Sequence, residues 1–341
     1  MKHRSAVVLA SVVAATAVAG GALSLAQRPA ATPPSRPAAP TAPPTAPMTA
    51  LGYTAVDDPA THTVVVFGGV DNYDNTWLWD GTRWRLTHPS ANPPGRFGAS
   101  AAFDPQTSQV LLFGGRLESG DAANDTWAWN GITWRELATG SKGPPAGEGS
   151  AMAWDGAADE MVLITAVSEG GSGNWTWRGG QWVNQMSSYF PNAAFVSGLA
   201  FDPVARSLVA VGCCQSPTSA GGTIDTTWRL DGGRWRQLVL APNPPAAGSS
   251  LALDPALGRL VLCSCDGFLT SQPEMWMWTG TAWASLRIAP APVRLGIEVA
   301  DLDRHRLLVL GSPNQAASPI HIWALTGSTW QRLDGVGSDA P

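Results

Sequence analysis

Residues 103–134 read FDPQTSQVLLFGGRLESGDAANDTWAWNGITW, and this stretch decides the fold. An apolar segment over 98–103 ends in an Asp-Pro turn, and the apolar run 110–113 leads into a double glycine. Residues 126–129 alternate with a period of two, Asn130-Gly131 is a hairpin-turn dipeptide, and a further strand follows over 133–137. The stretch therefore predicts four short antiparallel strands.

This unit recurs six times along the chain. Ten residues separate the turn aspartate from the end of the second strand in each copy, and a motif of the form W-x-W-x-G-x-x-W follows, with Leu230 and Leu325 in place of the second tryptophan in the fourth and sixth copies. The first tryptophans of the motif are Trp77, Trp127, Trp175, Trp228, Trp276 and Trp323. Four strands repeated at this spacing are typical of a propeller blade. The sequence therefore predicts an all-β, six-bladed β-propeller over 49–333, with its tryptophans packed between neighbouring sheets.

The blades resemble those of the kelch family, in the form common in secreted bacterial proteins, which carries the elements FDP, VLLFGG and DTWxWxGxxW. The resemblance covers residues 49–333 and implies a kelch-like scaffold, although the double glycine is kept only at Gly68-Gly69 and Gly114-Gly115. Kelch propellers include copper oxidases similar to galactose oxidase, whose site needs two tyrosines, two histidines and a cysteine. No such constellation is found, since His62 and His305 fall in turns between first and second strands. The resemblance thus implies the scaffold alone, and we expect no cofactor.

The ends of the chain are predicted to lie outside the propeller. A basic start at Lys2–Arg4 and a long uncharged run predict a signal peptide over 1–26, with an uncleaved signal anchor as the alternative. Residues 27–48 form a linker rich in proline, alanine and threonine, and 334–341 form a C-terminal tail. We expect a protein that is secreted, or anchored to the outer face of the cytoplasmic membrane or cell envelope. It would contact the membrane only through a retained N-terminal segment.

Composition excludes some classes of function. A net charge of −5, with only 21 Lys and Arg residues, argues against a nucleic-acid partner. A hydrophobic content of 44% excludes a largely disordered chain.

The connections between strands indicate where binding takes place. Alternating strand direction places the turns between strands one and two, and between three and four, at one end of the propeller. The other connections meet at the opposite end, which we call the loop face, and they are long and different in each blade. Variable loops on a rigid scaffold commonly carry function. The candidate binding residues there are Asp71, Tyr73, Asp74, Arg116, Glu118 and Asp121.

Four cysteines end the second strands of the fourth and fifth copies: Cys213, Cys214, Cys263 and Cys265. In an exported protein they predict two disulfides, either between blades or with a vicinal Cys213–Cys214 bond. The alternative is a four-thiolate site for zinc or copper(I). We expect no metal site elsewhere.

The sequence favours a non-catalytic binding platform for a protein or a glycan. Two other classes stay open, namely a carbohydrate-active or oxidase-type enzyme on this scaffold, and a metal-handling protein that uses the cysteines. A sialidase would need Arg96, Arg116 and Arg294 to converge on a carboxylate, and no Tyr/Glu pair accompanies them.

Overall fold

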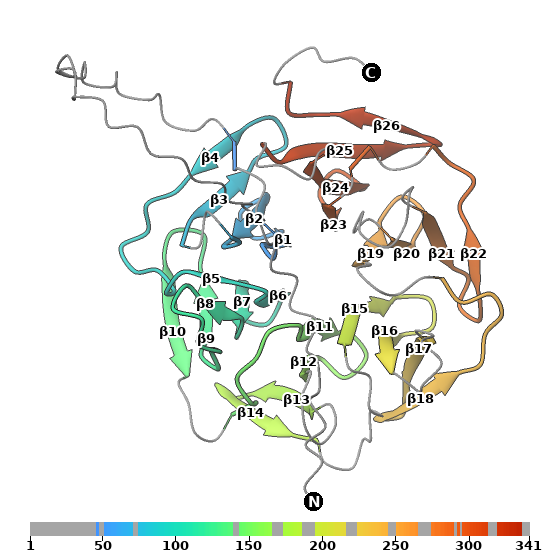
Figure 1. Ribbon diagram of the computed structural model, residues 1–341, viewed down its shortest axis with the longest axis horizontal. Helices are drawn as coiled ribbons and strands as arrows, with labels where there is room; N and C mark the ends of the chain where they lie inside the picture. Colours follow the sequence, from blue (N-terminus) through green and yellow to red (C-terminus); the bar gives the residue numbers. More distant parts are fainter. Residues whose placement is uncertain are drawn as a thin grey trace, which may run out of the picture. The chain divides into compact units, whose positions relative to one another are not determined.

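The computed structural model describes residues 46–47, 51–70, 74–138, 143–165, 173–185, 195–215, 224–244, 250–264, 274–289, 292–293, 295–312 and 319–335. They form six four-stranded antiparallel sheets arranged as blades around a central axis (Figure 1). The predicted fold class is confirmed. The predicted signal segment and most of the predicted linker lie outside the described residues. Of the linker, Ala46 and Pro47 are described: Ala46 is buried, and the carbonyl of Pro47 accepts from the backbone N–H of Ile320 at 2.7 Å. No helix able to cross a membrane is found among the described residues.

Each blade is built from four strands that follow one another along the chain. Blade one contains β1 (Thr54–Asp58), β2 (Thr63–Phe67), β3 (Thr76–Trp79) and β4 (Trp84–Leu86), and blade two contains β6 (Ser100–Asp104), β7 (Gln109–Phe113), β9 (Thr126–Trp129) and β10 (Trp134–Ala138). Blade three contains β11 (Ala151–Asp155), β12 (Glu160–Thr165), β13 (Gly173–Arg178) and β14 (Gln181–Asn184), and blade four contains β15 (Phe195–Asp202), β16 (Ser207–Gln215), β17 (Ile224–Asp231) and β18 (Arg234–Leu238). Blade five contains β19 (Ser250–Asp254), β20 (Arg259–Cys263), β21 (Met275–Trp278) and β22 (Trp283–Ser285), and blade six contains β23 (Leu295–Asp301), β24 (Arg306–Ser312), β25 (His321–Thr326) and β26 (Thr329–Arg332).

The core lies between the blades, where a separate apolar cluster fills each seam. The seam between blades one and two, for example, buries Val65 and Phe67 against Leu112 and Trp129. Fourth-strand tryptophans also reach across seams, because their indole N–H donates to the threonine that precedes the first motif tryptophan in the third strand of the preceding blade. These bonds are Trp134 to Thr76 at 2.9 Å, Trp182 to Thr126 at 2.8 Å and Trp283 to Thr227 at 2.9 Å. The repeated Thr and Trp residues of the motif thus join neighbouring blades by side-chain hydrogen bonds.

The turns between first and second strands are built alike in every blade. An aspartate ends the first strand and caps the turn, as Asp104 does by accepting from the backbone N–H of Gln106 at 2.9 Å. A left-handed residue precedes the second strand, and it is His62 in blade one and His305 in blade six. Both histidines therefore lie in the turns that the sequence predicts for them, at the end opposite the loop face.

The ring closes without a shared strand, since β1–β4 and β23–β26 form complete, separate sheets. Side chains join the last blade to the first. The Tyr53 hydroxyl donates to the carbonyl of Leu310 at 2.8 Å, within an apolar cluster that spans both blades. Arg304 donates to the carbonyl of Asp80 at 2.7 Å.

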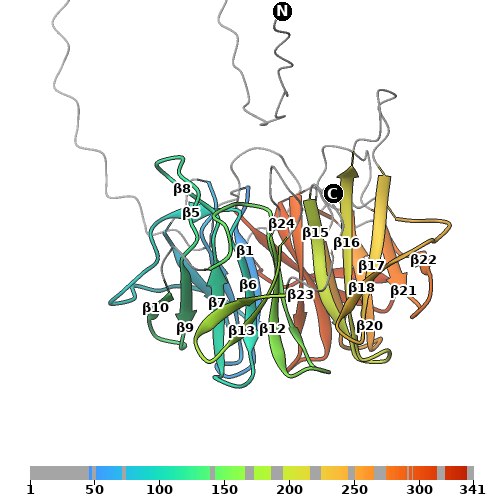
Figure 2. The ribbon, with the colours of Figure 1, turned by 90° about the horizontal axis from the view of Figure 1, so that it is seen from below.

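Blade two carries an addition that the repeat pattern does not predict. The two-residue strands β5 (Arg96–Phe97) and β8 (Arg116–Leu117) pair as a ribbon at the loop face (Figure 2). They come from the connection that enters blade two and from the loop after its second strand, which are separate in the sequence.

Candidate functional site

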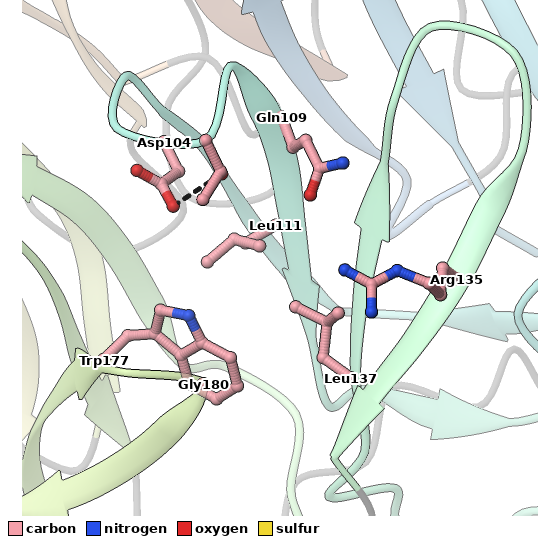
Figure 3. Close-up of a pocket in the computed structure, with 8 residues that line it drawn as sticks. Asp104, Gln109, Leu111, Arg135, Leu137, Trp177 and Gly180 are labelled. Atoms are coloured by element: carbon pink, nitrogen blue, oxygen red, sulfur yellow. Dashed lines mark hydrogen bonds between the residues drawn. The ribbon is translucent and has the colours of Figure 1, made fainter.

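A cavity of about 230 Å³ opens between blades two and three (Figure 3). Blade two contributes its first turn and the strands β6, β7 and β10, and blade three contributes Trp177 at the end of its third strand and Gly180 in the following turn. The lining residues are Asp104, Thr107, Gln109, Leu111, Arg135, Leu137, Trp177 and Gly180. The cavity therefore lies toward the turn end of the propeller, away from the loop face where the sequence predicts binding.

Trp177 differs from its counterparts in other blades. Trp79, Trp129 and Trp278 hold the same motif position and are at most 1% exposed, whereas Trp177 is only half-buried. Its ring still packs on Trp182, with centroids 5.1 Å apart, so its orientation is fixed. Trp177 thus packs against the apolar cluster between blades two and three, as the sequence predicts, and its half-buried ring also offers an ordered aromatic surface to the cavity.

The turn after Trp177 explains the exposure. In blade two the last pair of the hairpin is Trp129 with Trp134, which leaves a four-residue turn that leans on blade one, so that a Cβ at Gly131 would lie 2.5 Å from Thr61. In blade three the pairing continues to Arg178 with Gln181, and the turn shrinks to two glycines. Both glycines have positive φ, as a type I′ turn requires, and a Cβ on either would meet nothing within 4 Å.

The polar groups of the cavity are of two kinds. Asp104 is committed to its turn, since its Oδ1 accepts from Gln106 and its Oδ2 accepts from the Thr107 hydroxyl at 2.8 Å. Trp177 Nε1 and the side chains of Gln109 and Arg135 make no hydrogen bond to any residue in the described part of the chain. The guanidinium of Arg135 points into the cavity between Gln109 and Leu137 (Figure 3). Leu111 and Leu137 complete an apolar floor, so the cavity combines an aromatic ring with unpaired polar groups, which is typical of ligand sites.

The candidate residues at the loop face are only partly described. Asp71 and Tyr73 lie outside the described residues, and Asp74, Glu118 and Asp121 are exposed there. Arg116 lies beside them but is paired, because it bonds Glu148 at 2.9 Å and the carbonyl of Gly120 at 2.9 Å. No residue of this set lines the cavity.

Arg96 has a structural position that excludes it from ligand contact. Its side chain is 0% exposed and donates to the carbonyls of Pro94 at 2.9 Å and Gly114 at 3.0 Å, and to both oxygens of Asp125. Trp127 Nε1 also donates to Asp125, at 2.7 Å. Burial would raise the pKa of the Asp125 carboxyl, but these hydrogen bonds and the charge of Arg96 hold that pKa below its ordinary value. Arg96 anchors the ribbon of blade two and does not face Arg116 across a site, and Arg294 lies outside the described residues.

Among the cysteines, only the side chain of Cys263 is described. It is 0% exposed and disulfide-bonded. The side chains of Cys213, Cys214 and Cys265 lie outside the described part, so the predicted pairing stays a prediction. Within the residues that are described, no group of three or more His, Cys, Asp or Glu side chains could hold a metal ion.

Sequence reasoning missed the cavity, although a signal for it was present. Residues 178–181 read RGGQ after the second tryptophan of the motif, whereas blades one and two have DGTR and NGIT there. In those two blades, Asp80 and Asn130 cap the wide turn by accepting backbone N–H bonds. Arg178 cannot do so and pairs with Glu160, which leaves the glycines to form the tight turn.

No protein-family model and no curated protein sequence matches this chain. Solved structures do resemble it. SapL1 lectin in complex with alpha methyl fucoside is 15% identical with a TM-score of 0.57, covering 86% of this chain and 98% of its own. YjhT is 14% identical with a TM-score of 0.55, covering 85% and 99%. A point mutant of Aleuria aurantia lectin in complex with Fucalpha1-6GlcNAc is 13% identical with a TM-score of 0.58, covering 87% and 100%. At these identities the likeness shows the propeller fold, which two lectins share with this chain.

Proposed function

We propose that this protein is a non-catalytic, glycan-binding propeller and that the cavity between blades two and three holds a sugar ring. The observation that carries the proposal is the half-buried ring of Trp177, which lines the cavity beside the unpaired side chains of Arg135 and Gln109. Flat apolar rings stack on the C–H faces of sugars, while guanidinium and amide groups bond their oxygens. The two fucoside-bound lectins of the same fold support this class of ligand.

The size of the cavity sets the scale of the ligand. Pockets for drug-sized molecules span roughly 300–1,000 Å³, so about 230 Å³ suits a single ring. Asp104 also suits a binding site better than a catalytic one, because both its oxygens already accept hydrogen bonds within its own turn. A proton-transferring carboxyl would need an oxygen within reach of the ligand.

The test is the substitution Trp177→Leu. Blades four and six carry Leu230 and Leu325 at the same motif position, so leucine is compatible with this fold. On an array of neutral, fucosylated and acidic oligosaccharides, we expect the wild-type chain to bind, and calorimetric titration of its best ligand should show about tenfold weaker affinity for the variant because the stacking surface is lost.

The matched control is Leu230→Ala, which removes the side chain at the equivalent position of blade four and should leave the affinity unchanged. Thermal melting of both variants reports whether the fold is retained. Equal affinity of Trp177→Leu and wild type would show that the cavity is not the site, and a wild-type chain that binds no glycan on the array would contradict the function itself.

A second binding surface at the loop face is supported by the ribbon of blade two. The pairing of β5 with β8 and the bonds of Arg116 hold Glu118 and Asp121 on an ordered, exposed platform. This surface suits a protein partner better than a sugar ring, because its exposed charges can complement those of a partner surface. Charge reversal at Asp121 should weaken capture of such a partner and leave glycan binding at the cavity unchanged, as measured by the same titration.

We also propose that the chain is a diverged kelch-like propeller, exported or held at the cell envelope on its proline-rich linker. The basic start, the uncharged run and the linker composition support this placement, and the disulfide at Cys263 is in keeping with an oxidising compartment. Intact mass of the protein recovered from its host, under non-reducing conditions, should show two hydrogens lost per disulfide, with residues 1–26 absent from a secreted chain and present in an anchored one. Free thiols, or recovery of the chain from the cytoplasm, would contradict the proposal.

A further inference from the structure

The cavity between blades two and three is rich in hydrogen-bond donors. Arg135 brings a guanidinium with five N–H groups, and Trp177 brings an indole N–H that can only donate. Neither group is paired within the described residues. Gln109 adds an amide that can donate as well as accept.

Acceptors in the cavity are few by comparison. Asp104 is 3% exposed, and its two oxygens accept from Gln106 and Thr107. The Thr107 hydroxyl donates its hydrogen bond to Asp104, so its oxygen can only accept from a ligand. The Thr107 oxygen and the carbonyl oxygen of Gln109 are therefore the side-chain acceptors that a ligand can use. A neutral sugar, whose hydroxyls both donate and accept, would find more donors than acceptors among these side chains.

Arg135 forms no ion pair with a described residue in the cavity, although the carboxylate of Asp104 also lines it. Asp104 and Arg135 lie on opposite sides of it (Figure 3), and no ion pair joins Arg135 to any carboxylate of the described chain. The neighbouring arginine of blade three is different, since Arg178 bonds Glu160 at 2.7 Å. An exposed guanidinium beside an aromatic ring is thus available to a ligand.

We infer that the sugar held in this cavity is acidic, with a carboxylate or sulfate group that binds Arg135 while its ring lies on Trp177. This inference rests on the glycan-binding function proposed above and names its ligand class. An anionic group supplies only acceptors, which matches the unpaired donors of Arg135 and Trp177. A guanidinium can bond a carboxylate or a sulfate through two parallel N–H groups, and such charge-assisted bonds are about twice as strong as neutral ones.

The experiment compares ligands that differ only in charge. The full chain is titrated with a uronic acid methyl glycoside, with its carboxyl-reduced neutral counterpart, and with a sulfated monosaccharide of the same ring. We expect the acidic sugars to bind about tenfold more tightly than the neutral one at low salt, with the difference shrinking as salt is added. Comparing the affinities of the uronic acid and the sulfated sugar distinguishes a carboxylate ligand from a sulfate ligand.

The variants assign the preference to Arg135. Arg135→Gln should bind all three sugars with the same weak affinity. Arg135→Lys should keep part of the preference for acidic sugars, because lysine keeps the positive charge but lacks the two parallel N–H groups of the guanidinium. The matched control is Arg85→Gln, the same strand position in blade one, which should behave as wild type. Arg135 and Arg85 are both exposed, so the fold tolerates these changes, and thermal melting verifies this.

The outcomes separate failure of the acidic ligand class from failure of the glycan-binding function. If the reduced sugar binds as tightly as the uronic acid, or if Arg135→Gln keeps the preference, the inference of an acidic ligand is wrong while the glycan-binding function stands. If the wild-type chain binds none of these sugars and no glycan on the array, the proposed function and the inference both fail.

Discussion

The pair formed by Arg96 and Asp125 shows how a single polar contact holds a blade's variable part in place. Arg96 has no exposure to water, and its charge is balanced by the one carboxylate that accepts two bonds from it. Removing one member of a buried ion pair leaves the other charge uncompensated. The resulting loss of folding stability is larger than the net stabilisation that the intact pair provides. The ribbon at the loop face therefore depends on this contact.

Asp125→Asn should lower the free energy of unfolding by about 3–5 kcal/mol, because Arg96 stays buried without its counter-charge. Urea denaturation measures the change. The control Asp121→Asn, at the exposed tip of the same loop, should alter stability by at most about 0.5 kcal/mol. Equal midpoints for the two variants would show that water reaches Arg96 and that the pair does not act as a buried one.

The pH dependence of the same pair has a definite sign. The pKa of Asp125 lies below its ordinary value in the folded chain, so its contribution to stability is present above the unfolded pKa of about 3.9 and is lost as the pH falls through the folded pKa. The stability difference between wild type and Asp125→Asn should accordingly narrow in acid.

At the level of single residues, the sequence predicted in which strand a tryptophan lies better than it predicted how deeply the side chain is buried. The spacing of the motif located its tryptophans in the third and fourth strands, because a two-residue period and a tight turn leave little choice. The sequence could not predict that Trp177 is half-buried while Trp129 is fully buried. That difference depends on the turn that follows each residue and on the blade it leans against.

Among the elements, the turn between β13 and β14 is the one that opens the cavity. Replacing residues 178–181 with Asn-Gly-Ile-Thr, the sequence of the blade-two turn, should produce a wide turn that leans toward blade two as Gly131 leans on Thr61. We expect Trp177 to become buried and sugar binding to be lost without a fall in melting temperature. Quenching of tryptophan fluorescence by acrylamide reports the burial, and titration reports the binding.

A second graft provides the control. Asp-Gly-Gly-Arg, the two-residue turn of blade four, also removes the contact between Arg178 and Glu160 but keeps the tight geometry. This chain should bind sugar as wild type does. If both grafts abolish binding, Arg178 itself and not the width of the turn controls the cavity.

The strands of the six repeats were predictable because each carries its own pattern and its own turn residues. The pairing of β5 with β8 was not, since Arg96 and Leu117 belong to different connections and neither segment alternates in hydrophobicity. The cavity escaped prediction for a related reason, because its walls come from two blades and a repeat pattern describes one blade at a time.

For the whole molecule, the seam between blades six and one closes the ring. Asp57 lies there, at the strand position that Phe103, Trp154 and Phe201 hold in blades two to four. Its Oδ2 accepts from the backbone N–H of Leu302 at 3.3 Å.

The charged groups around Asp57 come from both blades. Blade six presents Asp301, which bonds Arg304 at 3.2 Å, and Asp303, which bonds His62 of blade one at 2.7 Å. Burial raises the pKa of Asp57 to about 7, the Leu302 bond opposes the shift, and the charges of Asp301, Asp303 and Asp58 add to it. The seam between blades six and one thus contains a carboxyl group whose protonated form is favoured in the folded chain.

The sign of its effect follows from this raised pKa. The folded chain holds the proton of Asp57 more tightly than the unfolded chain does, so the stabilisation is complete below about pH 4 and is lost as the pH rises through about 7. Asp57→Asn mimics the neutral carboxyl and should therefore match wild type at about pH 4 and exceed its free energy of unfolding by about 1–3 kcal/mol at about pH 8. Denaturation curves across this range measure the difference, with Glu118→Gln, at the exposed loop face, as a control that should follow wild type throughout. A variant that is less stable than wild type at the higher pH would mean that the ionised carboxylate, bonded to Leu302, holds the ring closed.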